Sequence, residues 1–215
     1  MVGAGSWGTT VASLVAHNAD TTLWARREDL VAEINARHTN SAYLPNATLP
    51  ETLRASTDLD ELIARADVVA MAVPSQGFRD VAARVATSIG RTTPVVSLSK
   101  GLERSTLMRM SQVLEESMPG NPVAVLSGPN LAREILAGQP AASVVACAND
   151  AVATTLQGLF SRPTFRLYTN PDVVGCEIGG VVKNVIAIAA GIAQGFGFGD
   201  NTKATLVTRG LAEMT

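Results

Sequence analysis

The stretch Gly3-Ala4-Gly5-Ser6-Trp7-Gly8 stands near the start of the chain and leads into an apolar segment from Thr9 to Ala16. Its three glycines match the GxGxxG pattern of a strand-to-helix turn that binds dinucleotides. The first glycine permits the turn, the second lets the backbone approach a pyrophosphate, and the third lets the helix pack on the strand. The helix N-terminus then offers free N–H groups to the phosphates. Glycine-rich turns also occur in ordinary βα units. The pattern of the surrounding segments therefore has to show whether this turn binds a dinucleotide.

The chain up to residue 170 alternates between strand-like and helix-like segments, which favours a mainly parallel sheet with helices on both faces. Valine-rich runs predict buried strands at 67–73 and 94–98. A weaker strand pattern covers 21–25, and further strand candidates cover 123–126, 142–147 and 165–168. Apolar residues at helical spacing predict helices at 28–37, 75–87 and 105–117. The sequence therefore predicts an α/β fold with a Rossmann-type, doubly wound sheet.

The segment 38–53 contains Pro45 and Pro50 and is predicted to be a surface loop. After Asn170-Pro171 the composition shifts to small residues and glycine, and two helices are expected, at about 173–194 and from near Asn201. We therefore expect a dinucleotide-binding domain over residues 1–170 and the beginning of an all-helical domain over residues 171–215. Only two apolar residues precede the glycines, and helical spacing runs to the last residue, so the chain is expected to be part of a longer protein.

Composition limits the function further. Of the 215 residues 47% are hydrophobic and 17% charged, with a net charge of −2, so nothing favours nucleic acid or an anionic membrane as a partner. A small-molecule substrate is the expected partner. Cys147 and Cys176 are isolated, and His17 and His38 lack metal-ligand spacing, so neither a metal site nor a disulfide framework is predicted. No signal-peptide pattern is present, and a cytoplasmic location is expected. A homodimer is compatible with the sequence, although no pattern requires one.

The apolar stretch 173–195 is long enough to cross a membrane, but it contains Glu177, Lys183, Asn184 and Gln194. Charged residues are costly in a bilayer, so the sequence predicts no membrane span. We expect instead a buried helix in a soluble protein.

Two arginines bear on the choice of cofactor. A site that prefers NAD(H) usually has Asp or Glu at the end of its second strand, about 20 residues past the glycines. Here that position is followed by Arg26 and Arg27. Guanidinium groups suit a 2′-phosphate, because they pair with phosphate through two hydrogen bonds. NADP(H) is therefore favoured and NAD(H) stays open; the alternative is a solvated arginine pair neutralised by Glu28 and Asp29.

Two polar clusters follow predicted strands. Lys100 lies just after the strand at 94–98, and Ser127-Gly128-Pro129-Asn130 follows the strand at 123–126. Ligands of open α/β sheets bind at the carboxyl ends of the strands, so both clusters are expected at one edge of the sheet. A lone lysine at such an edge can also be a solvated loop charge.

Lys183 lies among small and apolar residues in the predicted helix, in the sequence GGVVKNVIAIAAG from residue 179 to 191. A buried ammonium group requires a partner, a cavity or a ligand. Desolvated lysines lose their proton more readily, which suits a general base. The residue pattern leaves open whether Lys183 is such a base, extends its ammonium group to solvent, or pairs with a carboxylate such as Glu177.

Taken in order, GAGSWGT, LWARR, SLSKGLE, LSGPN followed by Ala132-Arg133-Glu134, GGVVKNVIAIAAG and TRGLAEM resemble the bacterial type of NAD(P)-dependent glycerol-3-phosphate dehydrogenase. The resemblance covers essentially the whole chain. It implies interconversion of sn-glycerol 3-phosphate and dihydroxyacetone phosphate by hydride transfer, feeding glycerophospholipid synthesis. It places cofactor contacts on Ser6, Trp7, Arg26, Arg27, Lys100 and Ala132. It places substrate contacts on Lys100, Gly128, Asn130 and Lys183, with Lys183 as the proton acceptor.

The family continues with further helices that carry an Arg-Asn pair for the substrate phosphate, and no segment of this chain matches them. Two alternatives therefore stay open. One is another Rossmann dehydrogenase, of the hydroxyacid or 6-phosphogluconate type. The other is a catalytically silent dinucleotide-binding module.

Overall fold

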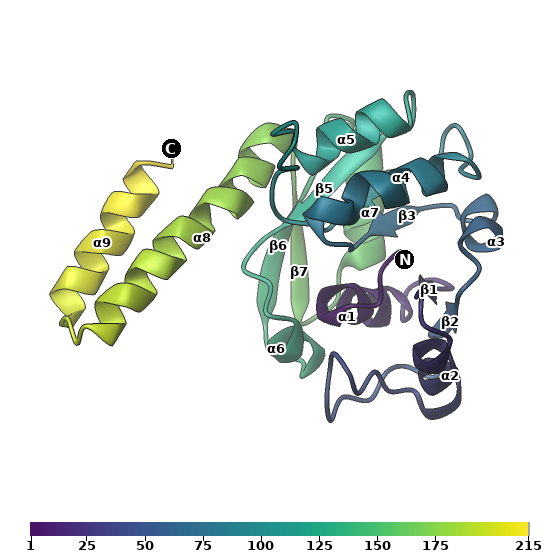
Figure 1. Ribbon diagram of the computed structural model, residues 1–215, viewed down its shortest axis with the longest axis horizontal. Coiled ribbons are helices and arrows are strands. Elements are labelled where there is room, and N and C mark those ends of the chain that lie inside the picture. The colour runs from purple at the N-terminus through teal and green to yellow at the C-terminus, as the bar shows by residue number, and fades with distance from the viewer. Residues whose placement is uncertain (215) are drawn as a thin grey trace.

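A computed structural model describes residues 1–214, and its centre is a twisted, mainly parallel sheet (Figure 1). The strands are β1 (Thr22–Trp24), β2 (Arg54–Ser56), β3 (Val69–Met71), β4 (Val95–Ser97), β5 (Val123–Ser127), β6 (Ala141–Ala146) and β7 (Phe165–Asn170). β1 pairs with β2, and β3 to β7 form a row in chain order. All these pairs are parallel except β5 with β6, which is antiparallel.

Val2 joins the two groups of strands. It forms parallel bridges to Trp24 of β1 and to Met71 of β3. Its N–H donates to the carbonyl of Ala70 at 2.7 Å, and its carbonyl accepts from the N–H of Ala72 at 2.8 Å. β1 and β2 lie on one side of Val2, and β3 to β7 lie on the other side. The direction in which the chain adds strands to the sheet therefore reverses at Val2. Ligands of open α/β sheets bind at such a reversal.

Helices cover both faces of the sheet. They are α1 (Ser6–Val15), α2 (Glu28–Arg37), α3 (Leu59–Ala64), α4 (Phe78–Ala86), α5 (Met110–Ser117), α6 (Ala132–Leu136), α7 (Asp150–Phe160), α8 (Val173–Gly195) and α9 (Asp200–Ala212). A 3₁₀ turn, η1 (Ser75–Gly77), precedes α4.

Alternate strand residues face two separate cores. Leu23, Ala70 and Val96 pack with α1, α6 and α7, whereas Val69, Met71 and Val95 pack with α3, α4 and α5. This period of two is the expected consequence of side chains pointing to opposite faces of a strand. Because both cores are apolar, both faces of the sheet are covered, which confirms the predicted doubly wound fold.

Some predicted boundaries are wrong. The helix expected at 105–117 begins only at Met110, because Leu107 has a left-handed φ of 60° and the preceding loop turns back through a bridge between Leu102 and Arg109. The helix expected at 75–87 is split into η1 and α4. The loop at 38–53 contains turns but no helix or strand, as predicted.

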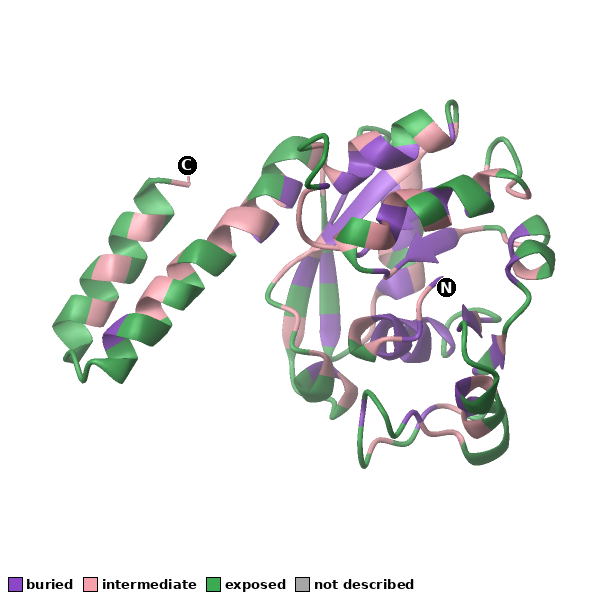
Figure 2. Ribbon diagram, viewed as in Figure 1, coloured by how far each residue is buried: buried purple, intermediate pink, exposed green. Residues whose placement is uncertain are grey.

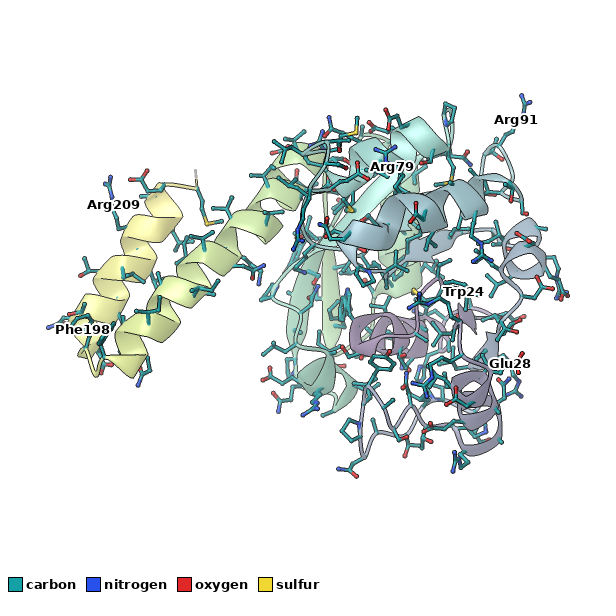
Figure 3. The ribbon with its side chains drawn as sticks, viewed as in Figure 1. Trp24, Glu28, Arg79, Arg91, Phe198 and Arg209 are labelled. Atoms are coloured by element: carbon teal, nitrogen blue, oxygen red, sulfur yellow. The ribbon has the colours of Figure 1, made fainter. Side chains whose placement is uncertain are left out.

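α8 and α9 form a helical pair that extends away from the sheet (Figure 1). The expectation that α8 is a buried helix is wrong for the described residues, since only Glu177, Gly180 and Ala193 are buried (Figure 2). α8 packs on β5 and β6 near Gly180, whereas α9 lies beside its later part, near Ile186 and Gln194 (Figure 1). By length and composition alone α8 could cross a membrane, but its buried Glu177 ties it to the α/β domain. Phe198, in the turn between the two helices, lies far from the sheet (Figure 3).

Candidate active site

The glycine loop lies at the carboxyl end of Val2, where the winding of the sheet reverses. Gly3 has a φ of 109°, and a β-carbon on it would lie 2.6 Å from the carbonyl oxygen of Ala72. A side chain is therefore excluded at Gly3 by both strain and space. Gly5 is the N-cap of α1, and a β-carbon on it would meet no atom within 4 Å. The loop is thus tightly packed on the sheet but leaves open space at Gly5, which fits a pyrophosphate near the free N–H groups of α1.

A cavity of about 520 Å³ opens beside this loop. Seven of the predicted cofactor residues line it: Gly3, Gly5, Ser6, Trp7, Gly8, Arg26 and Arg27. A larger cavity of about 790 Å³ lies at the opposite ends of the strands, beside Thr22 and Asp67. We assign the smaller cavity as the dinucleotide site, because it contains the glycine loop and lies at the carboxyl ends of the strands.

The two arginines of the cavity differ in their surroundings. Arg27 donates from Nε to Oδ1 of Asp29 at 3.0 Å and from Nη2 to Oδ2 of the same carboxylate. This pairing raises the pKa of Arg27 and lowers that of Asp29. Arg26 is exposed and has no hydrogen bond or ion pair within residues 1–214. Arg26 is therefore the freer of the two guanidinium groups to meet a phosphate.

Trp7 and Ala132 lie where α1 meets its neighbours. The Trp7 ring packs edge-on against Phe165, with ring centroids 6.4 Å apart, and its buried Nε1 has no hydrogen-bond partner in the described part of the chain. Ala132 begins α6, and its carbonyl accepts from Oγ1 of Thr10 at 3.4 Å. Ala132 does not line the cavity.

Lys100 and Lys183 belong to segments far apart in the chain, yet the charge of one acts on the other. Lys100 follows β4 directly after Ser99, which lines the cavity, and Lys183 lies in α8. Burial lowers the pKa of Lys100, and the positive charge of Lys183 lowers it further. Neither ammonium group has a carboxylate partner within residues 1–214. Two cations that act on each other without a counter-ion favour an anionic ligand near them.

The open alternative for Lys183, an ion pair with Glu177, is wrong. The carboxylate of Glu177 instead accepts from Nη1 of Arg109 at 2.7 Å. It also accepts from the backbone N–H and the hydroxyl of Ser111.

The loop after β5 is pressed against β6. A β-carbon on Gly128 would stand 2.4 Å from Oγ of Ser143, so only glycine fits there without movement. Asn130 accepts from the Ser143 hydroxyl through Oδ1, and its buried Nδ2 has no partner among the described residues. An unpaired buried amide is costly, which suits a group that hydrogen-bonds a ligand.

Sequence reasoning did not single out Tyr43 and Ser143. Tyr43 lies in the 38–53 loop and lines the cavity with Arg26 and Arg27, but no local pattern marks it. Ser143 is 3% exposed and holds Asn130. A hydroxyl inside the apolar run 142–147 was the available signal for Ser143.

Comparison with known proteins identifies the family. The N-terminal model of NAD-dependent glycerol-3-phosphate dehydrogenase matches residues 1–153, and the C-terminal model matches residues 172–215. The curated glycerol-3-phosphate dehydrogenase [NAD(P)+] 2 of Sphingopyxis alaskensis is 54% identical over the whole chain, and the chain covers 65% of that protein. The enzyme of Corynebacterium diphtheriae is 53% identical, with 66% of it covered. The chain thus spans about two thirds of the length of these relatives.

Solved structures support the same family assignment. The crystal structure of glycerol-3-phosphate dehydrogenase from Coxiella burnetii superposes with a TM-score of 0.91 at 38% identity, covering 99% of this chain and 66% of that one. The structure from Dunaliella salina gives a TM-score of 0.92 at 32% identity, covering 100% and 40% respectively. The other Rossmann dehydrogenase types are not favoured by these matches. The chain belongs to the NAD-dependent glycerol-3-phosphate dehydrogenase family.

Proposed function

We propose that the protein is an NAD(P)-dependent glycerol-3-phosphate dehydrogenase that interconverts sn-glycerol 3-phosphate and dihydroxyacetone phosphate. The observation that carries this proposal is that the charge of Lys183 acts on Lys100, the residue after the cavity-lining Ser99, while neither lysine has a carboxylate partner in the described residues. The names of the bacterial relatives and the match of both family models support it.

The glycine loop, Ser6, Trp7 and the two arginines would hold the dinucleotide, with Lys100 and Ala132 near its reactive end. When bound, the nicotinamide supplies the two-electron acceptor or donor for carbon C2 of the substrate. NADP(H) is favoured because Arg26 is free to pair with a 2′-phosphate, and NAD(H) is the second choice.

The protein's own groups orient the substrate and move its proton. Lys183 accepts the proton of the C2 hydroxyl during oxidation and returns it during reduction. Lys100, which lies beside Lys183, balances negative charge at the same oxygen or at the substrate phosphate. Asn130 offers its unpaired Nδ2 as a donor, and Gly128 keeps the loop close to β6.

The product glycerol 3-phosphate is the backbone of glycerophospholipids, so we propose that the reaction feeds lipid synthesis. A cytoplasmic location follows from this proposal, since its cofactor and substrate are metabolites of the cell interior. Assembly as a homodimer is a further proposal, compatible with the exposed apolar side chains Val185, Ile188 and Ile192 on α8.

The test is a pair of substitutions at Lys183. Lys183→Ala is expected to keep NADPH affinity near that of the wild type but to lower kcat by about 10²–10⁴-fold, the usual contribution of a positioned proton acceptor. Lys183→Arg should not restore turnover, because a guanidinium group stays protonated near neutral pH. Lys203→Ala is the control, since Lys203 pairs with Asp200 and donates to Gln194, and does not line the cavity. An Arg variant with kcat within a few-fold of wild type would reject the catalytic role.

A further inference from the structure

Glu177 is a buried carboxylate on α8 whose hydrogen bonds all come from the beginning of α5. It accepts from Nη1 of Arg109 at 2.7 Å, from the backbone N–H of Ser111 at 2.9 Å and from Oγ of Ser111 at 2.5 Å. Its side chain is 6% exposed, and that of Arg109 is 17% exposed. Arg109 is the N-cap of α5 and Ser111 lies in its first turn, where a negative charge also meets the positive end of the helix dipole.

These three hydrogen bonds fix the position of α8 on the α/β domain. A buried carboxylate is strongly unfavourable without donors, and here three donors are fixed on the α/β domain. If α8 rotated or slid by one residue, the carboxylate would leave all three donors and Arg109 would remain partly buried without its partner.

Glu177 is the first of a series of fixed points along α8. One turn later, a β-carbon on Gly180 would lie 2.9 Å from Oγ of Ser127, so the helix touches the carboxyl end of β5 there. Lys183 follows after one further turn and lies close enough to Lys100 for its charge to act on that lysine. Beyond Lys183, α8 is covered mainly by α9 and is largely exposed. The contacts that orient Lys183 toward the sheet therefore lie on its N-terminal side.

We propose that Glu177 is a positioning residue which, together with Arg109 and Ser111, holds α8 in the register that places Lys183 beside Lys100. This inference rests on the proposed function, because it assigns Glu177 a role through the proton acceptor of that site. Glu177 itself contacts neither lysine in the described structure.

The first test is Glu177→Gln in the full-length enzyme. Glutamine keeps the size of the side chain but removes its charge. It also replaces one acceptor oxygen by an NH2 group, which cannot accept the hydrogen bonds that Arg109 and Ser111 donate. α8 then loses its fixed register, and displacements of about 1 Å can cost about 10²-fold in rate. We expect kcat to fall by about 10–100-fold, whereas the Kd for NADPH should stay within about twofold because the glycine loop is untouched.

The second measurement does not depend on activity. The sequence contains three lysines, Lys100, Lys183 and Lys203, so acetylation of each can be followed by mass spectrometry as a function of pH. In the wild type, burial and the charge of Lys183 keep the pKa of Lys100 low. If α8 shifts in Glu177→Gln, that charge moves away, the pKa of Lys100 rises and its labelling moves to higher pH. Lys203 is the internal reference, and Lys183→Ala sets the full size of the change.

Two variants separate positioning from mere stabilisation. Glu116→Gln is the matched control. Glu116 lies on the same helix α5 and pairs with Arg79, and no hydrogen bond or ion pair of the described residues joins it to α8, so kcat and Lys100 labelling should equal those of the wild type. The double variant Glu177→Gln, Arg109→Met removes both buried charges. Its melting temperature should be higher than that of Glu177→Gln, because no unpaired charge is buried. Its kcat should stay as low as that of Glu177→Gln, because no group then fixes the register of α8.

Wild-type kcat together with wild-type Lys100 labelling in a folded Glu177→Gln protein would overturn the inference. If that variant does not fold, Ser111→Ala removes one donor only and is expected to shift both readouts in the same direction by a smaller amount; unchanged values there would also overturn it. Failure of the proposed function has a different signature. In that case Lys183→Ala keeps full turnover, while the labelling of Lys100 still reports the position of α8.

Discussion

Gly8 lies so close to Gly3 that a β-carbon on Gly8 would stand 1.9 Å from the carbonyl oxygen of Gly3. The same β-carbon would lie 2.9 Å from the β-carbon of Ala72, on the strand end beyond β3. The first and last glycines of the loop are thus in mutual contact, and both are held against the sheet. Side chains are excluded from these two positions by the backbone itself.

We therefore expect Gly8→Ala to destabilise the protein. The clash is with a backbone carbonyl, so no change of rotamer relieves it, and the loop or α1 has to move. Overpacking of this kind costs on the order of 1–3 kcal/mol. Urea denaturation of the wild type and the variant measures the difference, and equal midpoints would contradict the packing described for the loop.

Gly5→Val should behave differently. A β-carbon on Gly5 meets no atom within 4 Å, so the fold is expected to tolerate the side chain. The same side chain would occupy the space where the backbone approaches the pyrophosphate, and dinucleotide binding should be lost. Circular dichroism and NADPH fluorescence are the two measurements. Normal NADPH binding by a correctly folded Gly5→Val protein would mean that the cofactor site lies elsewhere.

Replacing both arginines, in Arg26→Ala with Arg27→Ala, should weaken NADPH binding far more than NADH binding, because only NADPH carries the 2′-phosphate. Loss of one charge-assisted contact costs roughly 1.5–3 kcal/mol, or about 10–150-fold in affinity. Of the single variants, Arg26→Ala should have the larger effect, since Arg27 is already engaged by Asp29. Titration with both cofactors measures the ratio. Equal losses for NADPH and NADH would reject the assignment.

The sequence predicted the doubly wound fold because the glycine loop and the valine-rich runs at 67–73 and 94–98 carry strong local signals. β2 and α3 were missed, since three and six residues respectively are too few to display a period. The start of α5 was placed too early because the backbone at Leu107 has a left-handed conformation. No residue type in 105–109 indicates such a conformation.

Single residues of the candidate site could be predicted from the sequence, but their arrangement in space could not. Lys100 and Lys183 could each be singled out from a local pattern, yet their proximity depends on how α8 crosses the ends of β5 and β6. The ion pair between Lys183 and Glu177, which the residue pattern left open, could not be excluded from the sequence for the same reason. Arg109 and Lys183 are both cations, and only the three-dimensional path of α8 selects Arg109.

The last prediction concerns acid stability and the loop that carries Lys100. Glu103 follows Lys100 by three residues and accepts from Nε and Nη2 of Arg79 at 2.8 and 2.9 Å. The hydrogen bonds from Arg79, with a further one from Thr106, lower the pKa of Glu103 from 4.5 to about 2. Because the folded-state pKa lies below the unfolded-state value, the carboxylate stabilises the fold above about pH 4.5. This contribution is lost as the pH falls from about 4.5 towards about 2.

Glu103→Gln should therefore lower the melting temperature at pH 7, and the difference from the wild type should shrink as the pH falls through that window. Thermal unfolding at a series of pH values between 7 and about 2 measures it. Glu61→Gln is the control, since Glu61 forms an exposed pair with Arg65 on α3 and should contribute little at any pH. If the Glu103 difference stayed constant across the window, protonation of this carboxylate would not be coupled to folding. The loop after β4 would then be held by its backbone hydrogen bonds, such as that from the N–H of Glu103 to the carbonyl of Met108.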